Sequence, residues 1–415
     1  QKETCVTRVP QVRMNDMTDC AGAGPLSGIR VLDFGRFIAG PFCATLLGDL
    51  GAEVIRIERI DGGEDRWFTP VTDDGQGAMF LQVGRNKRCL TLNPLKPDGA
   101  QVLKRLVATA DVVVANLPPK TLSAMGLDYE SLKAVKSDII LTTVNAFASG
   151  GPYSDRVGFD ALAQAMSGNL HLSGEAEQPT RAFVPYVDFA TAALSAFSTL
   201  AALRHRDQTG EGQVLEGALL KTALTMMNSV LIEQDVKKVD RVATMNRGQW
   251  NGPSDVFRTQ DGWIMCLAIG AQQFSRWCDM VGQSELVDDP RFTDDLARGD
   301  HGEALSNIMM TWCQSRTQDE VLSAMDDAKI PAGPVYSPQQ ALDDEHIQAL
   351  NFLKAVDYPT ATQSIPTADF PVSMSASRAE IRHRAPMLGE HTDEILVELG
   401  YDAASIEDLR SRRVV

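Results

Sequence analysis

Apolar and polar positions along the first 150 residues follow patterns that predict strands and helices in turn. Short runs rich in β-branched residues predict strands at 28–35, 52–59, 88–93, 111–117 and 138–147. Helical spacing characterises three segments between them, at 40–51, 97–110 and 128–135. Because strands that alternate with helices form parallel sheets covered by helices, this part is predicted to have an α/β fold.

The pattern changes in the second half of the chain. Helices are predicted at 158–168, at 188–206 and from Leu215 to about Gln234, with a turn cluster at 208–213. A hairpin with its turn at Gln260-Asp261-Gly262 is predicted at 254–270, and helical segments follow to about Ala328. The C-terminal part predicts weak strands and a helix at 389–400, capped by Thr392.

Composition and charge exclude several classes of function. The chain has 415 residues and a net charge of -16, which argues against nucleic-acid binding. Its seven cysteines contain no CxxC pair and no Cys/His cluster, so the sequence predicts neither a disulfide framework nor a metal site. We see no apolar run long enough for a membrane span, and we expect residues 1–24 to form a flexible arm rather than a secretory signal.

The ends of the predicted strands carry the candidate binding chemistry. The first turn reads DFGRFIAGP and lacks GxGxxG, so a dinucleotide cofactor is not supported. Gly40-Pro41 still provides a close-approach turn before a helix. Basic side chains recur near strand ends, which indicates either a local anion site or solvated surface charge; they are Arg36, Arg59, Arg85, Lys87, Lys96, Lys120 and Arg156.

Asp188 is the one carboxylate in an apolar stretch, AFVPYVDFATAAL, that opens a long helical run. A residue in this position is predicted to be a helix N-cap, and a reactive carboxylate is the alternative. The six histidines have no metal-binding spacing, and no GxSxG motif indicates a serine hydrolase.

Seven collinear motifs resemble the family III CoA-transferases, which include the α-methylacyl-CoA racemases. They span about Leu26 to the C-terminus and read LSGIRVLDFGRFIAGPFCATLLGDLGAEVIRIER, NKRCLTLN, ADVVVANLPPKTLSAMGLDYESL, GFDALAQAMSG, LRHRDQTGEGQ, IPAGPV and APMLGEHTDEIL. The resemblance implies a Rossmann-like large α/β domain with a parallel sheet, an inserted small α+β domain and an interlocked homodimer. The expected ranges are 25–234 for the large domain, 235–253 for a linker, 254–330 for the small domain, and 331–415 for a linker and return to the large domain.

The resemblance also implies a chemistry and a set of residues. Asp188 matches the family's nucleophile, which forms a mixed anhydride with the acyl group and then an aspartyl-CoA thioester. Acyl-CoA and small carboxylic acids are the expected partners, with no tightly bound cofactor and no metal. The positions that match coenzyme A contacts are Phe37, Ile38, Ala39, Arg59, Leu92, Lys96, Asn116, Leu117 and Arg156.

Two other functions remain open. A racemase needs a histidine in a Gly-His-Asp triplet, but this chain has Gly158-Phe159-Asp160, and phenylalanine cannot carry a proton. A non-catalytic acyl-CoA-binding protein is the other alternative. The expected compartment is the cytoplasm, with the mitochondrial matrix as the alternative.

Overall fold

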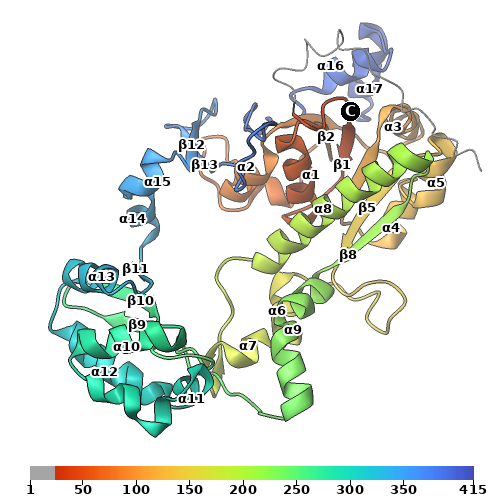
Figure 1. The fold of residues 1–415 in the computed structure, drawn as a ribbon. Coiled ribbons are helices and arrows are strands. Elements are labelled where there is room, and N and C mark those ends of the chain that lie inside the picture. The colour runs from red at the N-terminus through yellow and green to blue at the C-terminus, as the bar shows by residue number, and fades with distance from the viewer. Residues whose placement is uncertain (1–23) are drawn as a thin grey trace, which may run out of the picture. The chain divides into compact units, whose positions relative to one another are not determined.

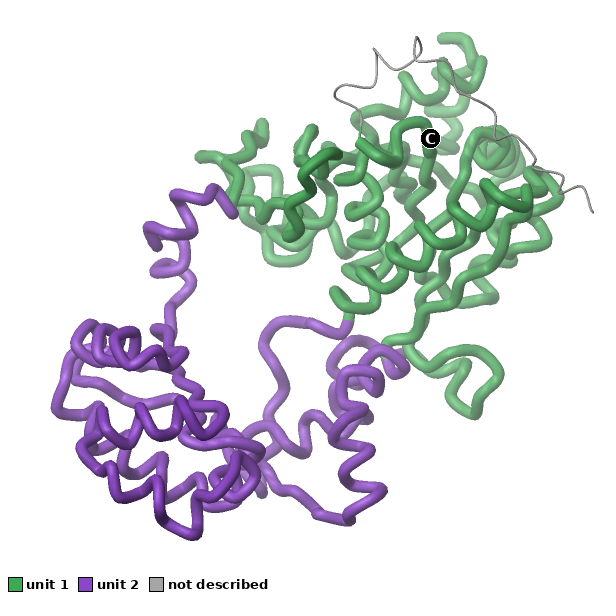
Figure 2. The backbone as a smooth tube through the Cα atoms, viewed as in Figure 1, with its two compact units in different colours: residues 1–157, 188–219, 353–415 green, residues 158–187, 220–352 purple. Residues whose placement is uncertain are grey.

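The computed structural model describes residues 24–415, which divide into two compact units (Figure 2). Within the described residues, unit 1 comprises 24–157, 188–219 and 353–415, and unit 2 comprises 158–187 and 220–352. The expected N-terminal arm lies outside the described residues, apart from Gly24.

Unit 1 is built on a six-stranded sheet with the order β3-β2-β1-β4-β5-β8, and every neighbouring pair is parallel. The strands are β1 (Arg30–Asp33), β2 (Glu53–Glu58), β3 (Lys87–Thr91), β4 (Val112–Ala115), β5 (Ile140–Asn145) and β8 (Val214–Ala218). The predicted α/β fold with a parallel sheet is confirmed, and the strand order is that of a Rossmann-like domain.

Helices cover both faces of this sheet (Figure 1). Side chains that point to one face, such as Leu32 and Val113, share a core with α3 (Pro97–Thr109), α5 (Tyr129–Val135), α16 (Thr392–Glu398) and α17 (Ala403–Ser411). Their neighbours in sequence, such as Val31 and Val112, point to the other face and pack with α1 (Ala39–Asp49) and α8 (Tyr186–Thr209). Successive strand residues alternate between the two cores, which explains the almost continuous apolar runs.

Strand β8 contradicts the sequence prediction. Residues from Leu215 were predicted to be helical, but Val214–Ala218 pairs with β5, and helix α9 (Leu219–Lys237) begins only after it. Position 217 needs a glycine because the strand lies close to α8. A Cβ there would lie only 2.9 Å from Ser195 Oγ. Pairing with β5 overrides the helical propensity of the local sequence.

Unit 2 contains a small antiparallel sheet with the order β11-β10-β9. The predicted hairpin is confirmed as β9 (Ser254–Arg258) and β10 (Trp263–Leu267), and β11 (Ala332–Pro334) adds a third strand. The sheet shares a core with α10 (Gly270–Val281), α12 (Gly302–Gln314) and α13 (Gln318–Asp327). The remaining helices of unit 2 are α6 (Asp160–Met166), α7 (Asn169–Leu172), α9, α11 (Asp295–Asp300), α14 (Pro338–Asp343) and α15 (Glu345–Ala349).

The compact units group some segments differently from the expected domain ranges. Residues 158–187 and 220–234 group with unit 2, although both fall in the range expected for the large domain. The hairpin of β6 (Gly174–Glu175) and β7 (Gln178–Pro179) gives a physical reason, since Glu175 forms a β-bridge with Thr244. The sequence prediction placed domain boundaries at turn residues, which mark where the chain bends. The compact units depend instead on contacts between distant segments, which the sequence does not show.

Two predicted helix caps are wrong by one or two residues. Asp188 is not the N-cap of α8, because the helix already begins at Tyr186 and places Asp188 in its first turn. Thr392 is the first residue of α16 and follows the N-cap His391. Its hydroxyl oxygen accepts a hydrogen bond from the backbone N–H of Thr91 in β3 (3.2 Å), so it fixes the helix to the sheet instead of capping it.

Helix α8 is, within the described residues, long and apolar enough to cross a membrane by length and composition, and half of its most apolar window is buried. Its buried residues Ala192, Ala196, Ala202 and Leu203 belong to the core that it shares with α1. Core helices of globular proteins also meet the same criterion, so this is weak evidence for a membrane span.

His391 connects α16 to β3 and gives a pH-dependent stability. Its Nδ1 accepts a hydrogen bond from the backbone N–H of Cys89 (3.1 Å), which requires a neutral ring. Burial lowers the pKa of His391 below its usual value; Glu390 and Glu394 oppose this shift, and Arg88 and Arg384 add to it. The unfolded chain therefore takes up a proton first as the pH falls, so this stabilisation is complete above about pH 6.5 and is lost below it.

We expect wild type to lose about 1 kcal/mol more unfolding free energy than the variant His391→Asn between pH 7.5 and pH 5, because one hydrogen bond is broken. Asparagine keeps an oxygen acceptor for Cys89 N–H and does not titrate. Chemical denaturation at both pH values measures the difference. Parallel pH profiles for the two proteins would contradict the assignment.

Candidate functional site

The strand order of unit 1 reverses between β1 and β4, and this position brings two predicted site segments together. The chain leaves β1 at Asp33 and forms the turn Gly35–Ala39, while Asn116 follows the neighbouring strand β4. In open α/β sheets, ligands bind in the crevice at the carboxyl ends of the strands where the order reverses. The predicted contacts Phe37, Ile38, Ala39, Asn116 and Leu117 all lie there.

Asn116 holds the turn that follows β1. Its Oδ1 accepts a hydrogen bond from the backbone N–H of Arg36 (2.6 Å), and its Nδ2 donates one to the carbonyl oxygen of Arg36 (2.8 Å). The next residue, Phe37, has a φ of 58°, in the left-handed region that non-glycine residues rarely adopt. Backbone strain of this kind is concentrated at functional sites, where the surrounding structure maintains it.

The turn leads directly into α1, an 11-residue helix that begins at Ala39. Ile38 is the N-cap and provides no side-chain hydrogen bond. Among the described residues, no acceptor is found for the backbone N–H groups of Ala39 and Gly40. Unpaired amides and the helix dipole make such a terminus suited to an anion or to a developing oxyanion.

The first turns of α1 and α8 pack together, and Asp188 belongs to this turn of α8. Phe42 of α1 and Phe189 of α8 form an edge-to-face pair, with ring centroids 5.0 Å apart. Asp188 directly precedes Phe189 and is partly buried. A carboxylate in the first turn of a helix is favoured as an anion by the helix dipole.

Asp160 supports the start of α8 from within unit 2. Its Oδ2 accepts a hydrogen bond from the backbone N–H of Val187 (2.7 Å), and its Oδ1 accepts one from Gln164 Nε2. The side-chain oxygen of Gln164 accepts from the backbone N–H of Ala182 (3.1 Å). Asp160 thus performs the capping role that the sequence had assigned to Asp188.

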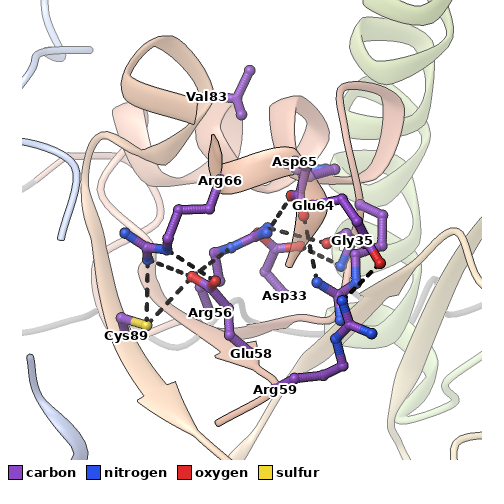
Figure 3. Close-up of polar contacts among 12 residues, drawn as sticks. Asp33, Gly35, Arg56, Glu58, Arg59, Glu64, Asp65, Arg66, Val83 and Cys89 are labelled. Carbon is purple, nitrogen blue, oxygen red and sulfur yellow. Dashed lines mark hydrogen bonds and ion pairs between the residues drawn. The ribbon is translucent and has the colours of Figure 1, made fainter. Parts of the chain in front are cut away.

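A buried ionic cluster lies beneath the turn after β1, and Arg56 of β2 is at its centre (Figure 3). Arg56 donates to Glu58 Oε1 (3.1 Å) and to Asp65 Oδ2 (2.5 Å), and its Nη1 lies 3.5 Å from Asp33 Oδ2. Arg66 contacts Glu58 through Nη2 (2.5 Å) and Nε (3.0 Å). Burial alone would raise the pKa of Glu58, but the two arginines lower it to about 2.

Lys87 completes the cluster from β3. Its Nζ lies 2.7 Å from Asp33 Oδ2 and donates to the carbonyl oxygen of Pro41 in α1 (2.7 Å). Burial would raise the pKa of Asp33, yet Lys87 and Arg56 hold it below its usual value. Asp33 is therefore a charged anchor, and its other oxygen accepts from the backbone N–H of Gly35 (2.8 Å).

The other residues that were predicted to contact coenzyme A follow β2 or β3, or lie on the loop after β5. Arg59 follows β2, is exposed and pairs with Glu64 (2.8 Å). Lys96 precedes α3, and its Nζ donates to the carbonyl oxygen of Arg412 (2.5 Å). The side chain of Leu92 is buried in the core, and Arg156 is exposed and lies over the Tyr153 ring (4.0 Å).

The sequence reasoning missed the cluster below the turn. Arg56 and Glu58 are 1% exposed, although they stand in the short run EVIRIE that predicts a strand. The signal was present, because a strand buried on both faces has no solvent-facing side for two charged residues. Charges in such a strand need buried partners, but the sequence does not name Asp65 and Asp33 as those partners.

A large cavity of about 960 Å³ lies elsewhere, at the amino ends of β1, β2 and β3. It is lined by mixed charges, including Arg30, Arg88, Glu53 and Glu394, which form ion pairs with one another at 2.7–2.8 Å. Because these groups already neutralise one another and lie at the opposite edge from the switch point, we do not assign the candidate site to this cavity.

Comparison with known proteins identifies relatives over nearly the whole chain. The family model described as CoA-transferase family III matches residues 26–392. The succinyl-CoA–L-malate CoA-transferase beta subunit of Chloroflexus aurantiacus is 34% identical, over 94% of this chain and 98% of its own length. The succinate–glutarate CoA-transferase of Agrobacterium fabrum is 33% identical, over 90% of this chain and 96% of its own.

A solved structure has the same overall fold. The crystal structure of a CAIB/BAIF family protein from Brucella suis matches with a TM-score of 0.80 and 29% identity. The match covers 91% of this chain and all of the other.

Proposed function

The chain belongs to CoA-transferase family III and is an enzyme of the transferase class, and from that premise we propose that it transfers CoA through covalent intermediates on Asp188. The donor is an acyl-CoA thioester, and the acceptor is a free carboxylic acid. The observation that carries this proposal is the packing of Phe189 on Phe42, which supports a position for its neighbour Asp188 near the turn at the switch point.

The first half of the proposed reaction cleaves the donor. A carboxylate oxygen of Asp188 attacks the thioester carbonyl carbon, and the carbon–sulfur bond breaks to give a mixed anhydride and CoA thiolate. The thiolate then attacks the Asp188 carbonyl carbon of the anhydride. The donor acid leaves as a carboxylate, and an aspartyl-CoA thioester remains. Covalent catalysis of this kind divides one difficult exchange into easier steps.

The second half repeats these steps with the acceptor. The acceptor carboxylate attacks the aspartyl thioester, expels CoA thiolate and forms a new mixed anhydride. The thiolate attacks the acceptor's carbonyl carbon, which gives the new acyl-CoA and regenerates the Asp188 carboxylate. No water is consumed, and water must be excluded because it would hydrolyse either anhydride. The aromatic pair Phe42 and Phe189 next to Asp188 supports a dry reaction site.

The unpaired amides at the start of α1 support oxyanion stabilisation in each tetrahedral intermediate. We propose that Phe37, Ile38 and Ala39 contact CoA near the thioester, and that Leu117 contacts the pantetheine. For the nucleotide end we propose Arg59, Leu92, Lys96 and Arg156. Leu92 would take part through its main chain, because its side chain is buried in the core.

We propose that both acids are short dicarboxylates. The relatives from Chloroflexus aurantiacus and Agrobacterium fabrum are named for succinate together with malate or glutarate, and each of these acids has a second carboxylate. This proposal concerns substrate class and goes beyond family membership.

We propose further that the protein is an interlocked homodimer with an inserted small domain, as the family resemblance implies. In unit 1, the side chains of Leu194 and Phe197 on α8 are 48% and 70% exposed. In unit 2, Ile232 and Val236 on α9 are 55% and 73% exposed. Apolar helix faces of this kind support burial against a second copy of the chain.

The proposed compartment is the cytoplasm, with the mitochondrial matrix as the alternative. The described cysteines Cys43, Cys89, Cys266, Cys278 and Cys313 are all free thiols. Free cysteines are typical of proteins in reducing compartments.

The transferase and its alternatives give different products in deuterated buffer. We expect the enzyme to convert succinyl-CoA and glutarate to glutaryl-CoA and succinate without incorporating deuterium at the α-carbon, because Phe159 cannot transfer a proton. Mass spectrometry of several acyl-CoA donors against a panel of free acids measures both products and label. α-Deuteration without CoA exchange would indicate a racemase, and binding without either reaction would indicate a non-catalytic protein.

A further inference from the structure

The turn between β1 and α1 has a shape that its own sequence does not favour. Phe37 is in the left-handed region, and the residues on either side are closely packed. A Cβ at Gly35 would lie 2.5 Å from Pro41 Cδ, and one at Gly40 would lie 3.1 Å from Asn116 Oδ1. The turn therefore depends on the side chains that surround it.

Two side chains from other strands hold the main chain of this turn. Asn116 uses both its acceptor and a donor on Arg36, at 2.6 Å and 2.8 Å. Arg56 donates from Nη1 to the carbonyl oxygen of Gly35 (3.1 Å). The main chain of Arg36 is thus held by Asn116, which follows β4, and the carbonyl oxygen of Gly35 is held by Arg56 of β2.

Arg56 is itself rigidly held (Figure 3). It is 1% exposed, and its remaining N–H groups are directed to Glu58 and Asp65, while Asp33 lies beside it. Asp65 also lies 3.4 Å from Nη1 of Arg36, so the same carboxylate contacts the side chain of the turn. A planar guanidinium with several fixed partners can define a position that a flexible lysine cannot.

We propose that Asn116 and Arg56 are positioning residues that set the conformation of Gly35–Ala39, and through it the amides at the start of α1. This inference rests on the proposed function, since it assigns those amides to the acyl-CoA site. It differs from the expected role of Asn116 as a direct contact of the pantetheine. The polar atoms of Asn116 serve the main chain of Arg36, and Arg56 acts from below the turn.

Hydrogen exchange of the protein without ligand tests the positioning role separately from activity. In Asn116→Ala, we expect exchange over residues 36–39 to rise, with the Arg36 amide exchanging about tenfold faster, because its N–H loses the acceptor Asn116 Oδ1. Arg56→Lys should give a similar effect, since an ammonium group cannot reproduce the fork to Gly35, Glu58 and Asp65. The matched control is Asn145→Ala, because Asn145 holds Ala148 N–H after β5 (2.6 Å) and does not contact this turn. Exchange at 36–39 should be unchanged in the control.

Kinetics of the same variants distinguish positioning from direct contact. For Asn116→Ala we expect kcat to fall about tenfold or more together with a rise in KM. Misplaced amides at the start of α1 would weaken both the binding of acyl-CoA and the stabilisation of the oxyanion. Asn116→Asp should regain activity as the pH falls, since only the protonated carboxyl can donate to the Arg36 carbonyl. Unchanged exchange at 36–39 with weaker CoA binding would overturn the proposal in favour of a direct contact. A wild-type protein with the expected exchange pattern but no CoA transfer would overturn the proposed function alone.

Discussion

Replacing Asp188 with alanine is expected to reduce CoA transfer by at least about a thousandfold while leaving CoA affinity within about threefold. The reaction needs a carboxylate that becomes acylated, and alanine cannot form the anhydride. The affinity should persist because the proposed CoA contacts come from the segments that follow β1 to β5 and not from α8. Steady-state kinetics and isothermal titration with CoA measure the two quantities.

The covalent intermediate gives a direct test of the same prediction. Hydroxylamine added during turnover should modify Asp188, and peptide mass spectrometry should locate the label. Asp207→Asn is a matched control, because Asp207 is an exposed carboxylate near the other end of the same helix. This control should keep wild-type activity and labelling. A turnover-dependent label at another residue, or near-normal transfer by Asp188→Ala, would be incompatible with the proposed mechanism.

Replacing Glu58 with glutamine is expected to lower the unfolding free energy by about 3–5 kcal/mol. Glu58 lies between Arg56 and Arg66, and all three side chains are at most 1% exposed. The other partners of Arg66 in the described residues are Gln76, the carbonyl oxygen of Pro386 and Cys89, so the substitution leaves it as an uncompensated buried cation. Denaturant titration at pH 7 measures the loss.

The pH dependence of wild type provides a second signature of Glu58. Its pKa of about 2 is lower than the usual value of 4.5, so its stabilisation is present above about pH 4.5 and is lost as the pH falls toward 2. This part of the acid unfolding profile should be absent from Glu58→Gln. Glu64→Gln is the control, since Glu64 forms an exposed pair with Arg59 and should change stability by less than about 0.5 kcal/mol. Equal effects of the two substitutions would show that the buried cluster does not stabilise the fold.

The sequence predicted the parts of the fold that depend on local pattern. The apolar runs of β1 to β5 and the helical spacing of α1 and α3 indicated the parallel sheet, because burial on both faces leaves a continuous apolar signal. Strand β8 was missed since Val214–Ala218 is short and half exposed, and only its pairing with β5 makes it a strand. The start of α8 was misplaced by two residues because the cap comes from Asp160, 27 positions away.

The candidate site could be predicted in its location but not in its internal contacts. Phe37, Ile38 and Asn116 were expected at strand ends, and the strand order does bring them to one switch point. The sequence could not show that Asn116 binds the main chain of Arg36, because that contact spans 80 residues. Arg56 was overlooked for the same reason, since its partners come from three separate segments.

The discontinuous path of unit 1 has a consequence for biosynthesis. One face of its sheet is covered partly by α16 and α17, whose residues Ile395, Leu396, Ile406 and Leu409 belong to that core. The ribosome must therefore make residues 220–352 after the last strand and before this cover, which takes roughly 7 to 27 seconds at about 5–20 residues per second. During that interval the nascent sheet exposes an apolar face, so its survival in the cell should depend on chaperones that bind unfinished chains.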